Sequence, residues 1–241
     1  MSVGRDLAVV GVANLLTGSF HDPPRLTNRQ LLSENRHRLG PMTHLRFAGL
    51  PSERQRAALE TLVRAEPFLM DVLVRLRTLG LPDAWVTSGA IYNCVWNRLT
   101  DRPPLTGIKD VDLIYFDDTD LGYDAEDKVI ARATTVFSDL PVPVELRNQA
   151  RVHLWFPERF GIAYPRLTHA TQSLDFYASK THAVALRLEA DDGLTIAAPF
   201  GLEAMFAFRM VPNRALDNRL THEKKCARAR VIWTELEIEP W

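Results

Sequence analysis

Acidic side chains alternate along one otherwise apolar segment. Asp110 and Asp112 lie two residues apart in a strand that we expect over residues 108–116. Side chains two apart in a strand point to the same face, with their carbons about 6 to 7 Å apart. Such a pair can bridge two cations about 4 Å apart, as in-line displacement at a phosphate requires. Glu145, in a second expected strand over residues 140–146, is the third acid that we expect to complete a metal site.

Small residues form a turn upstream of these acids. Ser88-Gly89-Ala90 follows an expected strand over residues 85–87 and precedes an expected helix over residues 91–99. A strand, a tight turn and a helix in this order present free backbone N–H groups and the positive end of the helix dipole to an anion. Glycine also lets the backbone approach a ligand closely. The turn is therefore predicted to bind phosphate groups.

Elements with helical and strand periodicity surround these segments. A helix is expected to begin at Ser52, with Ser52 and Gln55 as a capping box. We expect further helices over residues 68–79, 124–137, 148–156, 201–209 and 215–236, and a hairpin with arms 182–188 and 194–197 around Asp191-Asp192-Gly193. Gly80 is the expected end of the second helix. The pattern predicts one α/β domain with a helical tail.

The domain is expected to occupy residues 42–241. The whole chain of 241 residues has 46% hydrophobic and 24% charged residues, which is the balance of a soluble globular protein. Residues 17–51 are polar and turn-rich and lack a sustained period, and we interpret residues 1–41 as an N-terminal extension that is either disordered or upstream of a native start at Met42. The intact mass of the native product would decide this hypothesis.

Charge and cysteine usage narrow the function classes. The 29 basic and 30 acidic residues balance, so the chain lacks the basic footprint of a bulk nucleic-acid binder. The basic run at residues 222–230 is read as a solvated helix face, with a phosphate-binding edge as the alternative. Cys94 and Cys226 have neither disulfide nor zinc spacing. The apolar run at residues 7–16 is too short to span a bilayer, so we expect a cytoplasmic protein without a membrane partner.

The motifs together resemble a known superfamily. Ser88-Gly89-Ala90, Asp110-x-Asp112 and Glu145 are similar to the hydrophobic-Gly-[Gly/Ser], Asp-x-Asp and distal acid of the polymerase-β-like nucleotidyltransferases. The resemblance is closer to a bacterial nucleotidyltransferase family within it, once catalogued as a domain of unknown function. Four ordered blocks carry it, at residues 88–93, 107–117, 148–155 and 198–203.

The resemblance implies a fold, a cofactor and a reaction. It implies an α/β (α+β) fold with a mixed sheet flanked by helices, followed by a C-terminal hairpin and a helical extension. It also implies Mg²⁺ or Mn²⁺ and the transfer of a nucleoside monophosphate from a nucleoside triphosphate (NTP) such as ATP. The acceptor hydroxyl is not identified and belongs to a small molecule, an RNA or a protein. The sequence indicates no oligomeric state.

Roles for the residues follow from their charge. Asp110 and Asp112 are expected to bind an ion that bridges triphosphate oxygens, and Glu145 would join them around a second ion that lowers the pKa of the acceptor hydroxyl. The turn residues Ser88, Gly89 and Ala90 are expected to contact the nucleotide. Lys109 or Arg147 is a candidate to neutralise charge on the leaving pyrophosphate, without support from a motif.

Alternatives remain at the level of both protein and residue. A non-catalytic nucleotide-binding regulatory module is favoured by Ala90, which stands where Gly or Ser is usual. A metal-dependent phosphohydrolase is a third possibility. Glu145 has an alternative reading as a surface acid of an edge strand. Asn93, Asn148 and Gln149 are either nucleotide contacts or, slightly favoured, caps and cross-links of buried backbone.

Overall fold

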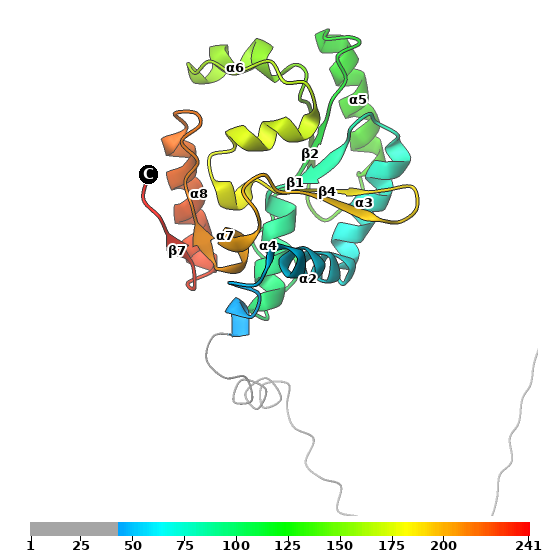
Figure 1. Cartoon of the computed structure of the whole chain (residues 1–241). Helices are drawn as coiled ribbons and strands as arrows, with labels where there is room; N and C mark the ends of the chain where they lie inside the picture. Colours follow the sequence, from blue (N-terminus) through cyan, green and yellow to red (C-terminus); the bar gives the residue numbers. More distant parts are fainter. Residues whose placement is uncertain (1–42) are drawn as a thin grey trace, which may run out of the picture. The chain divides into compact units, whose positions relative to one another are not determined.

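A five-stranded mixed sheet forms the centre of residues 43–241, the part of the chain that this computed structural model describes (Figure 1). Its strands are β1 (Trp85–Thr87), β2 (Val111–Tyr115), β3 (Val144–Asn148), β4 (Ala185–Leu188) and β5 (Leu194–Ala197), in the order β3-β2-β1-β4-β5. Only β2 and β3 pair in parallel, and the other neighbours are antiparallel. The predicted mixed sheet is confirmed.

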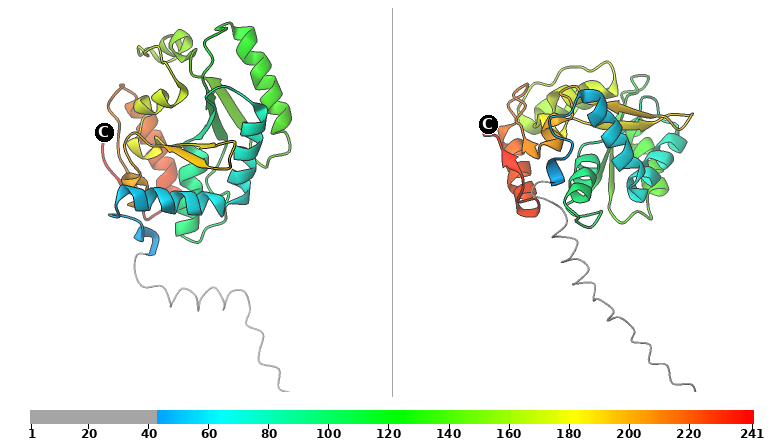
Figure 2. Two further views of the ribbon diagram at one scale, coloured as in Figure 1. Left: turned by 45° about the vertical axis from the view of Figure 1, so that its right-hand side comes forward. Right: turned by 60° about the horizontal axis from the view of Figure 1, so that its bottom comes forward.

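Helices cover the sheet and extend beyond it. They are α2 (Ser52–Arg64), α3 (Pro67–Leu79), α4 (Gly89–Leu99), α5 (Tyr123–Val136), α6 (Val152–Phe160), α7 (Glu203–Phe206) and α8 (Arg219–Ile232), with short 3-10 helices η1 (Thr43–Leu45), η2 (Ala170–Phe176) and η3 (Lys180–His182). A small parallel pair, β6 (Arg209–Met210) and β7 (Glu237–Ile238), flanks α8 in the chain. Helices α5 and α8 lie on opposite sides of this part of the molecule (Figures 1 and 2).

The two faces of the sheet have different surroundings because side chains alternate along each strand. Val111, Leu113 and Leu146 face the main hydrophobic core, together with buried residues of α2, α3 and α4. Ile114 faces a smaller cluster with Leu174 of η2. Asp112 is therefore on the face of the smaller cluster, away from the main core.

Trp233 fixes the position of α8 relative to α4. Its indole Nε1 donates to Asn97 Oδ1 at 3.2 Å, and its ring contacts Trp96 with centroids 5.2 Å apart. Gly107 (φ +77°) lies against the Trp233 ring, which a Cβ atom at Gly107 would strike. A loop that follows α4 and the end of α8 thus pack on each other, and α8 is held beside the sheet.

Several boundaries agree with the sequence predictions and others correct them. Gly80 ends α3 in the left-handed conformation, as expected. The helix predicted over residues 148–156 starts later, because Asn148 still pairs with Tyr115 in the sheet. The helix predicted over residues 201–209 shrinks to the four residues of α7, and the one predicted over 215–236 runs from Arg219 to Ile232.

The predicted capping box at Ser52 is wrong. Ser52 is the first helical residue, Pro51 occupies the cap position and no side chain caps the helix. Gln55 instead donates from its Nε2 to the Phe47 carbonyl and the Glu203 carboxylate, so it joins α2 to more distant segments.

Other expectations concern the chain as a whole. Cys94 and Cys226 are buried free thiols, as expected. No helix within residues 43–241 combines the length and the apolar run needed to cross a membrane. The hypothesis on residues 1–41 and the proposed start at Met42 lie outside the described residues.

Candidate active site

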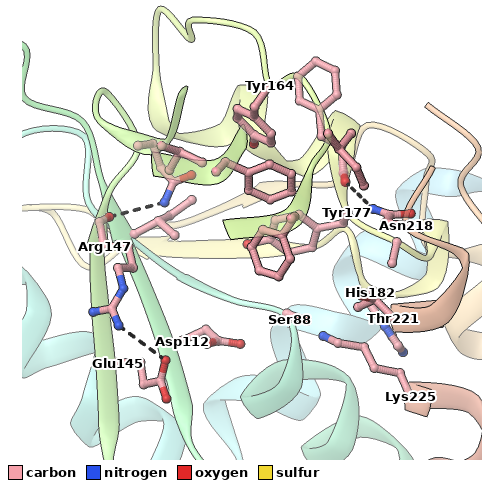
Figure 3. Close-up of a pocket in the computed structure, with 18 of the residues that line it drawn as sticks. Ser88, Asp112, Glu145, Arg147, Tyr164, Tyr177, His182, Asn218, Thr221 and Lys225 are labelled. Atoms are coloured by element: carbon pink, nitrogen blue, oxygen red, sulfur yellow. Dashed lines mark hydrogen bonds and ion pairs between the residues drawn. The ribbon is translucent and has the colours of Figure 1, made fainter. Parts of the chain in front are cut away.

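A cavity of about 590 Å³ lies between the sheet, the segment from α6 to η2, and α8 (Figure 3). Asp112, Glu145 and Arg147 line it from β2 and β3, and Lys225 lines it from α8. Ser88 reaches it from the turn before α4. Residues that are far apart in the sequence therefore meet at one hollow beside the sheet.

Two of the three predicted carboxylates, Asp112 and Glu145, line this cavity, and Asp110 is not among its lining residues. Asp112 and Glu145 are register partners on the parallel strands β2 and β3, and Asp110 immediately precedes β2. Burial raises the pKa of the Asp112 carboxyl to about 6; Lys225 lowers it, while the negative charges of Asp110 and Glu145 raise it further. Asp110 and Glu145 thus lie close enough to Asp112 for their charges to disfavour its ionisation.

Two cations face these carboxylates. The Lys225 ammonium points toward Asp112 in Figure 3, and burial lowers the pKa of Lys225 while Asp112 raises it. Lys225 and Asp112 do not form an ion pair within 4.0 Å among the described residues. Arg147 Nη2 lies 3.9 Å from Glu145 Oε2, and both side chains are exposed. Exposed pairs of this kind are weak, so Glu145 is available to another cation.

The Ser88 turn contains an unusual backbone conformation. Ser88 has φ 54° and ψ −113° at the cap position of α4, and its buried Oγ has no hydrogen-bond partner. A Cβ atom at Gly89, the first residue of α4, would meet no atom within 4 Å, so the space before the helix is open. Ala90 is fully buried in the main core, so its side chain contributes packing. The turn offers a hydroxyl group and a helix N-terminus to a ligand.

His182 is a cavity residue that the sequence did not reveal. It is 1% exposed, neither ring nitrogen has a hydrogen-bond partner, and its ring stacks on Tyr92 with centroids 4.4 Å apart. Burial holds the pKa of His182 well below its usual value, and the positive charges of Lys225, His222 and Arg228 act in the same direction. His182 is consequently neutral at pH 7, with one N–H donor and one acceptor.

Of the other predicted contacts, Asn93, Lys109 and Asn148 lie away from the cavity. Asn93 Nδ2 donates to the Gly107 carbonyl at 3.2 Å, and Asn93 is not a lining residue. Lys109 is exposed and does not line the cavity. Asn148 bonds the backbone of Asp117 through both its amide oxygen and nitrogen. Gln149 does line the cavity.

The donor set is suited to a hard divalent cation. Asp110, Asp112 and Glu145 supply carboxylate oxygens, which Mg²⁺ and Mn²⁺ prefer. Burial raises the pKa of Asp112, and repulsion from Asp110 and Glu145 adds to this effect. A cation between them would relieve that repulsion. Within residues 43–241, however, no three His, Cys, Asp or Glu side chains are arranged closely enough to enclose a metal ion.

Comparisons with known proteins identify a matching family and a similar solved structure. Residues 74–238 match a protein family described as nucleotidyltransferase. An NMR structure described as revealing a CCA-adding enzyme head domain has 25% sequence identity and a TM-score of 0.60, over 77% of this chain and 96% of that chain. No curated protein matches the chain.

Proposed function

The chain belongs to this nucleotidyltransferase family, and from that premise we propose that it transfers a nucleoside monophosphate from an NTP to an acceptor hydroxyl in a metal-dependent reaction. The observation that carries the proposal is the meeting of Asp112 and Glu145 with the Ser88 turn and Lys225 at one cavity. Acids for a cation and donors for a polyanion are the two requirements of phosphoryl transfer.

The triphosphate would lie along the positive side of the cavity. The Ser88 hydroxyl and the backbone N–H groups at the start of α4 would donate to phosphate oxygens. Lys225 would neutralise charge on the β- and γ-phosphates and on the pyrophosphate that leaves. The neutral His182 imidazole adds one N–H donor that has no partner within the protein.

The carboxylates would bind the cation. Asp110, Asp112 and Glu145 would hold Mg²⁺ or Mn²⁺, which when bound neutralises the triphosphate and lowers the pKa of the acceptor hydroxyl. In the transfer, the acceptor oxygen bonds to the α-phosphorus while the bond to the bridging oxygen breaks and pyrophosphate leaves. The hydroxyl proton goes to water. The chain's own residues orient both reactants, which is most of what this chemistry requires.

Transfer of label tests the proposal. Purified protein with Mg²⁺ or Mn²⁺ and α-³²P-labelled NTPs is incubated with pools of small molecules, RNA and protein. We expect label in one acceptor pool and its loss in Asp112→Asn, which removes a negative charge and keeps the side chain's shape. The melting temperature of Asp112→Asn should remain that of a folded protein. Undiminished transfer by a folded Asp112→Asn protein would refute the assignment.

A non-catalytic nucleotide-binding module is the second candidate. It is favoured by Ala90, which stands where Gly or Ser is usual in the turn and whose side chain is buried in the main core. This candidate predicts calorimetric NTP binding without pyrophosphate release in the presence of any acceptor pool. Pyrophosphate production that depends on an acceptor would exclude it, whereas production from water alone would indicate a phosphohydrolase.

A further inference from the structure

Five aromatic side chains line one wall of the cavity. This aromatic wall consists of Trp155, Phe156 and Phe160 of α6, Tyr164, and Phe176 of η2. The rings contact one another with centroids 4.6 to 6.4 Å apart. Figure 3 draws Tyr164 on the side of the cavity away from Lys225.

The aromatic wall is not explained by the packing of the fold. None of its residues belongs to either hydrophobic core of residues 43–241 or to the apolar residues packed against these cores. Phe160 is 49% exposed, and the other four rings are half-buried. Large aromatic side chains gain most when they are fully buried. A wall of incompletely buried rings around a hollow is typical of a surface that is completed by a ligand.

The cavity has two chemically different ends. One end has Ser88, His182 and Lys225, whose buried polar groups lack partners or carry positive charge. The other end is the aromatic wall. An NTP has the same division, because a polyanion lies at one end of the molecule and a flat aromatic base at the other. A cavity of about 590 Å³ falls in the usual range for a single ligand of this size.

We propose that the aromatic wall is the nucleobase subsite, where the base of the NTP stacks while its triphosphate lies at the Ser88 turn and Lys225. This inference rests on the proposed function and assigns a binding position to the nucleobase of the NTP. Stacking uses the π-face that every base has, so we expect the wall to accept all four bases with modest preferences.

The alternative occupant of the aromatic wall is an apolar acceptor. The nucleobase is favoured because the wall and the phosphate donors belong to the same cavity, so one molecule spans both. A polynucleotide would need an extended basic groove for its backbone. Among the described residues that line the cavity, the lysines and arginines are Arg147, Arg219 and Lys225. Three basic residues do not make such a groove.

Binding to two probes separates the two ends. The full chain with Mg²⁺ is titrated calorimetrically with α,β-methylene-ATP, which cannot release pyrophosphate, and with inorganic tripolyphosphate, which has no base. We expect the wild type to bind the nucleotide more tightly than tripolyphosphate. Phe156→Ala and Trp155→Ala should each weaken nucleotide binding by about 5- to 100-fold and leave tripolyphosphate binding unchanged, because loss of stacking on one base has effects of this size.

Matched variants guard against effects on folding. Leu154→Ala removes a side chain that is 52% exposed on the same helix and does not line the cavity, so it should bind both probes like the wild type. Phe156→Tyr keeps the ring and should retain nucleotide binding.

Three results would overturn the inference. If the Ala variants bind the nucleotide like the wild type, the base lies elsewhere and the acceptor is the occupant to test. If they weaken both probes equally, the wall supports the cavity and does not recognise the base. In both cases tripolyphosphate binding by the wild type leaves the proposed function standing. If the wild type binds neither probe, the proposed function fails together with this inference.

Discussion

Lys225 contributes to the cavity, whereas its neighbour in the sequence, Lys224, does not. Lys224 and Lys225 are adjacent in α8, but only Lys225 lines the cavity and points toward Asp112, whereas Lys224 is exposed (Figure 3). Lys225→Ala should weaken tripolyphosphate binding by about 10- to 100-fold, since a hydrogen bond to a charged group contributes about 1.5–3 kcal/mol. Calorimetry measures this effect.

The neighbouring lysine provides the control. Lys224→Ala removes the same charge from the protein and should change tripolyphosphate affinity only slightly, and less at higher salt. Equal losses in Lys224→Ala and Lys225→Ala would mean that α8 attracts the anion through its general charge, which contradicts a specific contact.

Ser88 combines a strained backbone with an unpartnered hydroxyl. A non-glycine residue with φ 54° and ψ −113° costs about 1–3 kcal/mol, and such strain is concentrated at functional sites. Ser88→Gly should therefore raise the free energy of unfolding by about 1 kcal/mol while weakening tripolyphosphate binding, because the hydroxyl is lost. Urea unfolding and calorimetry measure the two effects.

Ser88→Ala separates the two properties of this residue. It removes the unpartnered hydroxyl and keeps the backbone strain, so binding should weaken and the gain in stability should be smaller than in Ser88→Gly. A Ser88→Gly protein that is no more stable than Ser88→Ala would show that the turn is not strained.

Residue types and spacing predicted part of the candidate site. Asp112 and Glu145 could be placed because each lies in a short strand between clear turn signals, and parallel pairing brings them into register. Lys225 was visible only as one member of a basic run. His182 had no sequence signal, because its position depends on the stacking with Tyr92 across 90 residues of chain.

At the scale of elements, a buried ion pair joins α5 to the segment between β3 and α6. Arg151 Nη1 bonds Glu126 Oε2, and the two side chains are 10% and 8% exposed. Glu126 Oε1 also accepts from the Asn148 backbone N–H. Arg151→Ala should lower the free energy of unfolding by about 3–5 kcal/mol, because it leaves a buried carboxylate without its partner.

An exposed pair offers the comparison. Arg219 and Glu223 pair at 2.7 Å on α8 with side chains 60% and 45% exposed. Arg219→Ala should cost less than about 1 kcal/mol in the same urea titration. A loss in Arg151→Ala as small as in Arg219→Ala would mean that water reaches Glu126 and that the pair does not fix α6.

Element boundaries were predictable where local signals agree with the tertiary structure. Helix α3 ends at Gly80 because a left-handed residue suits glycine. The boundary between β3 and α6 was missed because Asn148 pairs in the sheet and bonds Asp117, and neither contact can be read from nearby residues. The long helix expected from residue 201 ends early because Arg209 pairs with Glu237 in β6 and β7.

At the scale of the whole molecule, the cavity joins residues from three distant parts of the chain. The β-strand acids, the Ser88 turn and α8 converge because β1 lies between β2 and β4 and because Trp233 holds α8 against α4. Local periodicity predicted most of the helices and strands, and the family resemblance implied the mixed sheet flanked by helices. The sequence did not predict that α8 and the aromatic wall line the same cavity as the sheet acids, because this arrangement depends on long-range packing alone.

This convergence couples the cavity to the stability of the fold through His182. In the folded protein the pKa of His182 is well below 6.5, because its ring is buried and faces Lys225, His222 and Arg228. Above pH 6.5 the imidazole is neutral in both states and has no effect. Below pH 6.5 the unfolded chain binds a proton that the folded protein excludes, so stability falls by up to about 1.4 kcal/mol per pH unit.

The Asp112 carboxyl acts in the opposite direction. Its raised pKa of about 6 lets the folded protein bind a proton before the unfolded chain does, so its contribution to stability grows as the pH falls through 6. Comparison with His182→Gln isolates the histidine, because both proteins contain the same carboxylates. We expect the stability of wild type minus that of His182→Gln, measured by urea unfolding in EDTA, to be constant from pH 8 to 7 and to decrease from pH 6.5 to 5. A difference that is constant down to pH 5 would mean that folded His182 binds protons freely, and a neutral donor facing the triphosphate would then be ruled out.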